Sequence, residues 1–209
     1  MNFKIDSIIF DLDGTLWNTT EIELKSINEI IEKKYNIPTI TLLQLEKVMG
    51  FTLDDAADTL FGKINKEIGI EILNISAATM IEHLKKSKIK PYETVIETLE
   101  ILNKKYKLYI VSNCEDGYIE TFIETQGLKG IFKDYECSGR TGMTKGNNIK
   151  LIKDRNNLIS PIYVGDTKKD FEAAKFADIP FIYAKYGFGK LDNYDISIEK
   201  FKDLLDIIS

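Results

Sequence analysis

Short apolar runs alternate with longer stretches in which apolar residues recur every three or four positions. Five runs predict strands at Ile5–Asp11, Lys107–Ser112, Tyr135–Ser138, Pro161–Gly165 and Pro180–Ala184. All but the third are nearly continuous, as expected of strands buried on both faces. Helical spacing between and after them predicts helices at Glu93–Asn103, Gly117–Gln126, Lys145–Asp154, Lys168–Phe176 and Ile198–Ile208. This alternation predicts the α/β class, with a doubly wound parallel sheet.

Residues 17–88 interrupt the alternation, because they contain no convincing strand. Helix starts are predicted where a capping residue precedes its partner by three positions, at Asn18, Thr41 and Thr52, and a further start is predicted at Ser76. We therefore expect an all-helical domain of four or five helices, inserted between two parts of an α/β core formed by residues 1–16 and 89–209. The insert follows the first strand, at the carboxyl end of the sheet, where open α/β folds bind ligands.

Composition narrows the possible functions. The chain has 209 residues, of which 44% are hydrophobic, and a formal net charge of -5. Its lysines are scattered, which argues against a nucleic-acid partner. No apolar stretch approaches the roughly 20 residues of a membrane span, and the N-terminus predicts no signal peptide. The two cysteines, Cys114 and Cys137, lie apart from the single histidine, so we expect reduced thiols and no zinc site. These features predict a cytoplasmic protein.

Two carboxylates lie where the first strand ends, in the segment Asp11-Leu12-Asp13-Gly14. A carboxylate can attack phosphorus and form an aspartyl-phosphate, which makes Asp11 the candidate nucleophile. Gly14 turns the chain so that Asp13 can reach the same site as general acid and then general base. Taken alone, the segment is also compatible with a simple turn stabilised by its aspartates.

Polar residues also end the second and fourth predicted strands. Ser112 and Asn113 could bind phosphoryl oxygens through a hydroxyl and a backbone amide. Lys145 begins a predicted helix and could neutralise the phosphoryl group while holding the nucleophile. Asp166 offers a hard oxygen ligand suited to Mg²⁺. Asp170 could hold a metal-bound water, or it could simply be an acidic residue favourable at a helix N-terminus.

These four segments, in this order, resemble the motifs of the haloacid dehalogenase-like superfamily of phosphohydrolases, and in particular its phosphoglycolate phosphatase-like members. The resemblance covers Ile5 to about Phe188. It implies a type-1 helical cap over residues 17–88 and an Mg²⁺ cofactor. The metal set would be Asp11, Asp166, Asp170 and, through its backbone carbonyl, Asp13. An acid two residues after the nucleophile points to phosphate esters, because the dehalogenases and phosphonatases of this superfamily lack it.

Three functions remain open from the sequence. The first is an Mg²⁺-dependent phosphatase that acts on a small phosphorylated metabolite, as a monomer or weak homodimer. The second is a sugar phosphomutase, although such members usually carry a histidine soon after the first motif and residues 17–30 contain none. The third, a non-catalytic phosphate-binding module, is disfavoured by the intact set of acidic and basic residues. Trp17 stands where the family often has a small or aliphatic residue.

Substrate choice would depend on the cap. The segment Gly50-Phe51, with Lys47 nearby, weakly resembles the cap loop that meets the substrate. The neighbouring leucines Leu42, Leu43 and Leu45 are expected to pack inside the insert. His83, the only histidine, is expected in a surface or packing role. The sequence does not identify the substrate.

Overall fold

The computed structural model describes residues 5–208 of the chain. It divides into two compact units: Thr19–Ile89 form one, and the segments up to Asn18 and from Lys90 form the other. The second, discontinuous unit is the α/β unit, and the first is the helical unit. No helix within the described residues is long and apolar enough to cross a bilayer.

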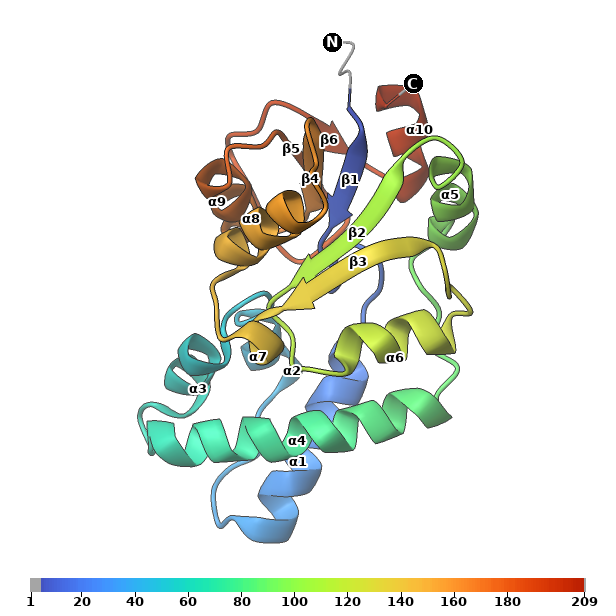
Figure 1. Ribbon diagram of the computed structural model, residues 1–209. Coiled ribbons are helices and arrows are strands. Elements are labelled where there is room, and N and C mark those ends of the chain that lie inside the picture. Colours follow the sequence, from blue (N-terminus) through green and yellow to red (C-terminus); the bar gives the residue numbers. More distant parts are fainter. Residues whose placement is uncertain (1–4, 209) are drawn as a thin grey trace. The chain divides into compact units, whose positions relative to one another are not determined.

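A six-stranded sheet organises the α/β unit (Figure 1). Its strands are β1 (Ser7–Phe10), β2 (Lys107–Ser112), β3 (Phe132–Cys137), β4 (Pro161–Gly165), β5 (Phe181–Ala184) and β6 (Ser197–Ile198). They follow the order β3-β2-β1-β4-β5-β6, and every neighbouring pair is parallel. The predicted fold class is confirmed.

Helices cover both faces of this sheet, and they are α5 (Val95–Leu102), α6 (Tyr118–Thr125), α7 (Ser138–Thr141), α8 (Lys145–Arg155), α9 (Lys168–Phe176), the 3₁₀ helix η1 (Phe201–Asp203) and α10 (Leu204–Ile207). On one face, Ile9, Val111 and Tyr163 pack with Ile149 of α8 and Ala174 of α9. Because successive strand residues point to opposite faces, the alternate residues face the other side. There the ring of Phe10 meets that of Phe201 at 5.6 Å.

The sequence misplaced two elements of the α/β unit. β3 begins at Phe132, three residues before the predicted start, because it is an edge strand with polar residues and an irregular register opposite Leu108 and Tyr109. The predicted C-terminal helix Ile198–Ile208 is wrong in its first part, since Ile198 pairs with Ala184 in β6. The remaining apolar residues of that segment instead follow a 3₁₀ turn and one short helical turn.

The helical unit contains α1 (Thr20–Lys34), α2 (Leu42–Glu46), α3 (Leu53–Phe61) and α4 (Lys66–Lys86), and α1 and α4 pack against each other. Its own apolar core joins residues of all four helices, among them Ile27, Leu45, Phe61 and Ile72. The unit therefore buries a core independent of the sheet.

Helix caps in this unit follow the sequence only in part. Thr41 and Thr52 accept hydrogen bonds from the backbone amides three residues on, so these two starts are confirmed. Asn18 does not cap α1, which begins after Thr19 without a side-chain cap. Ser76 lies inside α4 and its hydroxyl donates to the carbonyl of Leu73 at 2.9 Å, so no helix starts there.

Two of the leucines expected to pack inside the helical unit are exposed. Leu42 is 39% and Leu43 is 64% exposed, whereas Leu45 is buried. The helix that carries them has only five residues, so it presents just one of the three to the core.

Candidate active site

Three adjacent strands end at the same edge of the sheet, and each delivers one polar side chain there. Asp11 directly follows β1, Ser112 ends β2 and Asp166 directly follows β4. Because β2, β1 and β4 are neighbours and parallel, their carboxyl ends meet. The strand order reverses direction around β1, and such a switch point is where open α/β sheets bind ligands.

The turn after β1 carries Asp13 around this edge. Gly14 has φ +84°, a left-handed conformation that strains any residue with a Cβ. A Cβ at this position would also lie 2.2 Å from Oδ2 of Asp166. The turn is closed by the backbone amide of Gly14, which donates to the carbonyl of Trp17 at 2.9 Å. Glycine is therefore required both by the backbone and by the nearby carboxylate.

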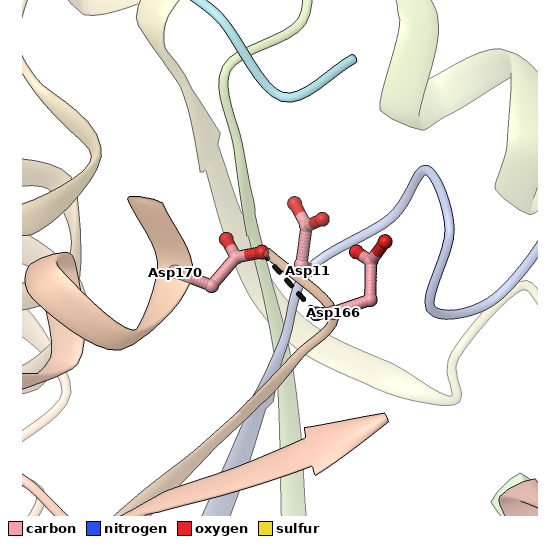
Figure 2. A group of neighbouring side chains, drawn as sticks. All are labelled: Asp11, Asp166 and Asp170. Atoms are coloured by element: carbon pink, nitrogen blue, oxygen red, sulfur yellow. Dashed lines mark hydrogen bonds between the residues drawn. The ribbon is translucent and has the colours of Figure 1, made fainter. Parts of the chain in front are cut away.

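Three carboxylates form a buried cluster, shown in Figure 2. Oxygen atoms of Asp11, Asp166 and Asp170 all lie within 4.8 Å of one another. Asp11 is 2% exposed and the other two are fully buried. Such a set can hold a hard divalent cation through oxygen ligands.

Lys145, the first residue of α8, is the cation that the protein itself supplies to the cluster. Its ammonium donates to Oδ1 of Asp11 at 2.7 Å and to Oδ1 of Asp170 at 2.6 Å. Burial opposes the charge of Lys145, but the two carboxylates outweigh it and raise the pKa of the ammonium. Lys145 is therefore protonated at any physiological pH.

One ammonium does not balance three carboxylates. Burial, followed by the charge of Asp170, raises the pKa of Asp11 to about 7 even though Lys145 opposes the shift. Burial and the charges of Asp170 and Asp11 likewise raise the pKa of Asp166. Burial and the neighbouring carboxylates thus both disfavour the ionised forms of Asp11 and Asp166, and a bound divalent cation would favour them. The donor set therefore fits a magnesium ion.

Asp170 also organises the backbone of this edge. Its Oδ2 accepts from the hydroxyl and amide of Thr167, at 2.6 and 2.9 Å, and from the amide of Asp166 at 3.2 Å. These contacts form a capping box at the start of α9. The structure confirms the helix N-terminal role of Asp170 and adds the ion pair to Lys145, while its role toward a metal-bound water stays a prediction.

Ser112 ends β2 and Asn113 follows it, at the same edge of the sheet as the carboxylate cluster. Ser112 is 3% exposed, and the side-chain oxygen of Asn113 accepts from Ser138 at 2.8 Å. Cys114 follows them and is a free thiol, as is Cys137. Burial, and then contact with Cys137, raise the pKa of Cys114. This makes Cys114 a poor nucleophile.

Other predicted residues belong to the helical unit. Lys47 is exposed at the C-terminus of α2, Gly50 has φ +75°, and Phe51 packs partly buried against the core of that unit. Nδ1 of His83 lies 3.1 Å from the hydroxyl of Ser26, and its Nε2 lies 3.4 Å from a carboxylate oxygen of Glu29.

Several residues that contact the acidic set were missed from the sequence. Asp166 accepts from the amide of Phe188 at 2.7 Å and from the hydroxyl of Thr15 at 3.4 Å. The hydroxyl of Tyr118 donates to Oδ1 of Asp13 at 2.6 Å. Thr167, which caps α9 and was also missed, is the one residue that the sequence could have identified, because Thr and Asp spaced three residues apart are typical of a capping box.

Comparison with curated proteins finds relatives that match over nearly the whole chain. A protein of Bacillus mycoides named pyrophosphatase PpaX is 27% identical over 99% of this chain and 98% of its own. The protein of the same name from Listeria welshimeri is 28% identical over 100% of this chain and 98% of its own.

Solved structures share the fold. A structure described as a predicted phosphoglycolate phosphatase from Haemophilus somnus has a TM-score of 0.84 at 20% identity, covering 98% of each chain. A haloacid dehalogenase-like family hydrolase from Streptococcus pneumoniae also has a TM-score of 0.84, at 22% identity, covering 98% of this chain and 99% of its own. The family model described as haloacid dehalogenase-like hydrolase matches residues 8–184. The chain therefore belongs to the haloacid dehalogenase-like hydrolases.

Proposed function

We propose that this hydrolase is an Mg²⁺-dependent phosphatase that cleaves a small organic phosphate monoester through an aspartyl-phosphate on Asp11. One observation carries the proposal: the Asp11 carboxylate is buried among Asp166, Asp170 and Lys145, and its Oδ1 is 2.7 Å from the ammonium of Lys145. A buried carboxylate fixed in this way is preorganised for attack, and the cationic partner offsets the repulsion between two anions.

In the first step an Asp11 oxygen attacks phosphorus while the ester oxygen departs. Lys145 holds the nucleophile by one oxygen and offers positive charge to the phosphoryl group. The hydroxyl of Ser112 and the backbone amide of Asn113 would bind the equatorial phosphoryl oxygens. Phosphoryl transfer depends mainly on such positioning and charge neutralisation.

Asp13 serves both steps as acid and base. It protonates the leaving alcohol oxygen, and it then takes a proton from the water that attacks the aspartyl-phosphate. Asp13 lies two residues after Asp11, in the turn that contains Gly14. Its carboxyl can therefore reach the ester oxygen while Asp11 attacks phosphorus.

Magnesium would be held by carboxylate oxygens of Asp11 and Asp166 and by the backbone carbonyl of Asp13, with Asp170 supporting the site. When bound, the ion supplies charge neutralisation to the phosphoryl oxygens. The cluster supports this assignment, because its carboxylate oxygens lie within 4.8 Å of one another, and burial with the neighbouring carboxylates raises the pKa of Asp11 and Asp166.

The helical unit, in this proposal, acts as the cap domain and selects the substrate. It is inserted directly after the first motif and is joined to the α/β unit by two segments, at Asn18 and Lys90. Exclusion of water by such a cap strengthens the charge interactions of the transferring group. Lys47, Gly50 and Phe51 are the candidate residues for substrate contact.

A second candidate substrate is inorganic pyrophosphate, because the curated relatives named pyrophosphatase match over nearly the whole chain. The same acidic and basic set could transfer the terminal phosphoryl group of a diphosphate. Sugar phosphomutation is a third reaction of this fold.

The test is a panel of phosphates assayed for phosphate release with Mg²⁺ and with EDTA. The panel includes 2-phosphoglycolate, glycerol phosphate, a hexose phosphate and pyrophosphate. We expect turnover of a monoester with Mg²⁺ and none with EDTA. Preference for pyrophosphate would support the second candidate. Interconversion of hexose phosphates without net phosphate release would refute the phosphatase proposal, as would activity that EDTA leaves unchanged.

A further inference from the structure

Tyr118 makes a hydrogen bond to the acidic set that the mechanism above does not use. Its hydroxyl donates to Oδ1 of Asp13 at 2.6 Å, across 105 residues of sequence. Both residues belong to the α/β unit. Tyr118 is 5% exposed and Asp13 is half-buried, so the bond is partly shielded from competing water.

The fold fixes the position of this hydroxyl from both sides. Tyr118 is the first residue of α6, and Gly117 before it has φ +86°, which turns the chain from the loop after β2 into the helix. The Tyr118 ring contacts the Trp17 ring at 5.4 Å, and Trp17 in turn meets Phe122 at 4.8 Å. Trp17 is itself tied to the turn by a bridge to Asp13. The contacts among these aromatic rings therefore hold the Tyr118 hydroxyl close to the Asp13 carboxylate.

We propose that Tyr118 is a positioning residue that orients the Asp13 carboxyl, so that its Oδ2 exchanges the proton with the leaving group. This inference rests on the proposed phosphatase function. A hydroxyl donor on Oδ1 favours the carboxyl conformation in which the proton resides on Oδ2. In the first step the P–O ester bond breaks, a bond from Asp11 to phosphorus forms, and the departing alcohol oxygen takes that Oδ2 proton. Tyr118 keeps its own proton throughout.

This role predicts a dependence on the leaving group. An alkoxide departs poorly unless it receives a proton, whereas p-nitrophenolate departs as the anion. General acid catalysis typically contributes about 10²–10⁴-fold, and misorientation of Asp13 should remove part of it. In Tyr118→Phe we therefore expect kcat/KM for glycerol phosphate to fall about tenfold or more, and kcat/KM for p-nitrophenyl phosphate to change by no more than about twofold. The parameter kcat/KM covers the steps up to alcohol departure, so slow hydrolysis of the aspartyl-phosphate does not mask the effect.

The control is Tyr106→Phe, which likewise removes a single tyrosine hydrogen bond. The Tyr106 hydroxyl donates to the carbonyl of Ile208 at 2.5 Å, and Tyr106 directly precedes β2, at the end of that strand opposite Ser112. We expect this variant to keep the wild-type ratio of the two kcat/KM values. A ratio is independent of the fraction of active protein, so partial misfolding of Tyr118→Phe cannot imitate the predicted result.

A double-mutant cycle supplies the second measurement. Asp13→Asn removes the group that Tyr118 positions, so adding Tyr118→Phe to it should change the ratio no further. Equal loss on both esters in Tyr118→Phe, or full additivity in the double variant, would overturn the inference while leaving the phosphatase function standing. If the wild-type protein hydrolysed no phosphate monoester, the proposed function would fall and this inference with it.

Discussion

Replacing Lys145 by methionine should destabilise the α/β unit and stop catalysis, and the effect on stability can be worked out from the structure. Methionine has similar length and no charge, so the change removes the ammonium and leaves most of the packing. Asp11 and Asp170 then remain buried without the cation that lies 2.7 and 2.6 Å from them in the wild-type protein. The expected loss of folding stability therefore comes from the buried carboxylates left without a cation, not from lost packing.

Each contact is worth about 6 kcal/mol of Coulomb energy at an effective dielectric constant near 20. Most of this offsets the cost of removing the charges from water, and breaking a buried ion pair typically costs about 3–5 kcal/mol net. We expect a loss in that range at pH 8. The matched control is Lys185→Met, which removes a 2.5 Å ion pair to Glu199 whose side chains are 33% and 71% exposed. An exposed pair should cost less than about 1 kcal/mol.

The loss should also depend on pH. The pKa of Lys145 is raised in the folded protein, so its contribution is fully present below the unfolded value of about 10. The pKa of Asp11 is raised to about 7, so Lys145 has this ionised partner only above that pH. Without Lys145 the pKa of Asp11 must rise further. The difference between variant and wild type should therefore widen as pH increases through about 7.

Urea unfolding in EDTA, followed by the fluorescence of Trp17, would measure this. Trp17 is the only tryptophan, it is 1% exposed and it lies in the α/β unit, so it reports the unfolding of that unit. A loss below 1 kcal/mol at pH 8, or a loss equal to that of Lys185→Met, would refute the reasoning. So would a difference that is the same at pH 5 and pH 8.

Three further outcomes follow from the same site. Asp11→Asn should unfold at or above the wild-type urea concentration and release no phosphate; acid-stable trapping of phosphate on the variant would contradict the nucleophile assignment. Mg²⁺ should raise the melting temperature more at pH 8 than at pH 5, because protons compete for Asp11 below about pH 7 and burial raises the pKa of Asp166 as well; an equal rise at both would argue against these ligands. Lys47→Ala and Phe51→Leu should reorder a substrate panel more than they change turnover of p-nitrophenyl phosphate; uniform loss on all esters would contradict a selective role.

The sequence predicts the polar residues at this edge of the sheet well, because each of them ends or directly follows a strand that nearby residues alone identify. Asp11 and Asp166 directly follow strands that are buried along their whole length, and Ser112 ends another. Once a parallel sheet is inferred, the carboxyl ends of its strands must lie at one edge. Nothing more than strand recognition is needed to bring these three side chains together.

Contacts between distant loops could not be predicted in this way. The bond from Tyr118 to Asp13 depends on the left-handed turn at Gly117 and on the tilted ring contact with Trp17, neither of which has a periodic signal. The two-residue strand β6 is similarly invisible, because Ile198 fits a helical spacing and becomes a strand only through pairing with Ala184. In both cases contacts between distant segments, rather than the local preference of the sequence, determine the structure.

The surroundings of Asp166 show why such residues escape local reading. A Cβ at Gly187 would lie 2.3 Å from the side chain of Asp166, and a Cβ at Gly189 would lie 2.4 Å from its carbonyl oxygen. Between them, Phe188 donates its amide to Asp166 at 2.7 Å. A fully buried carboxylate needs hydrogen-bond donors, and a backbone can approach this closely only where side chains are absent. The two glycines are thus required by the close approach of this loop to Asp166, and in the proposed mechanism, where that carboxylate holds the metal, the loop sequence follows from function more than from local folding preference.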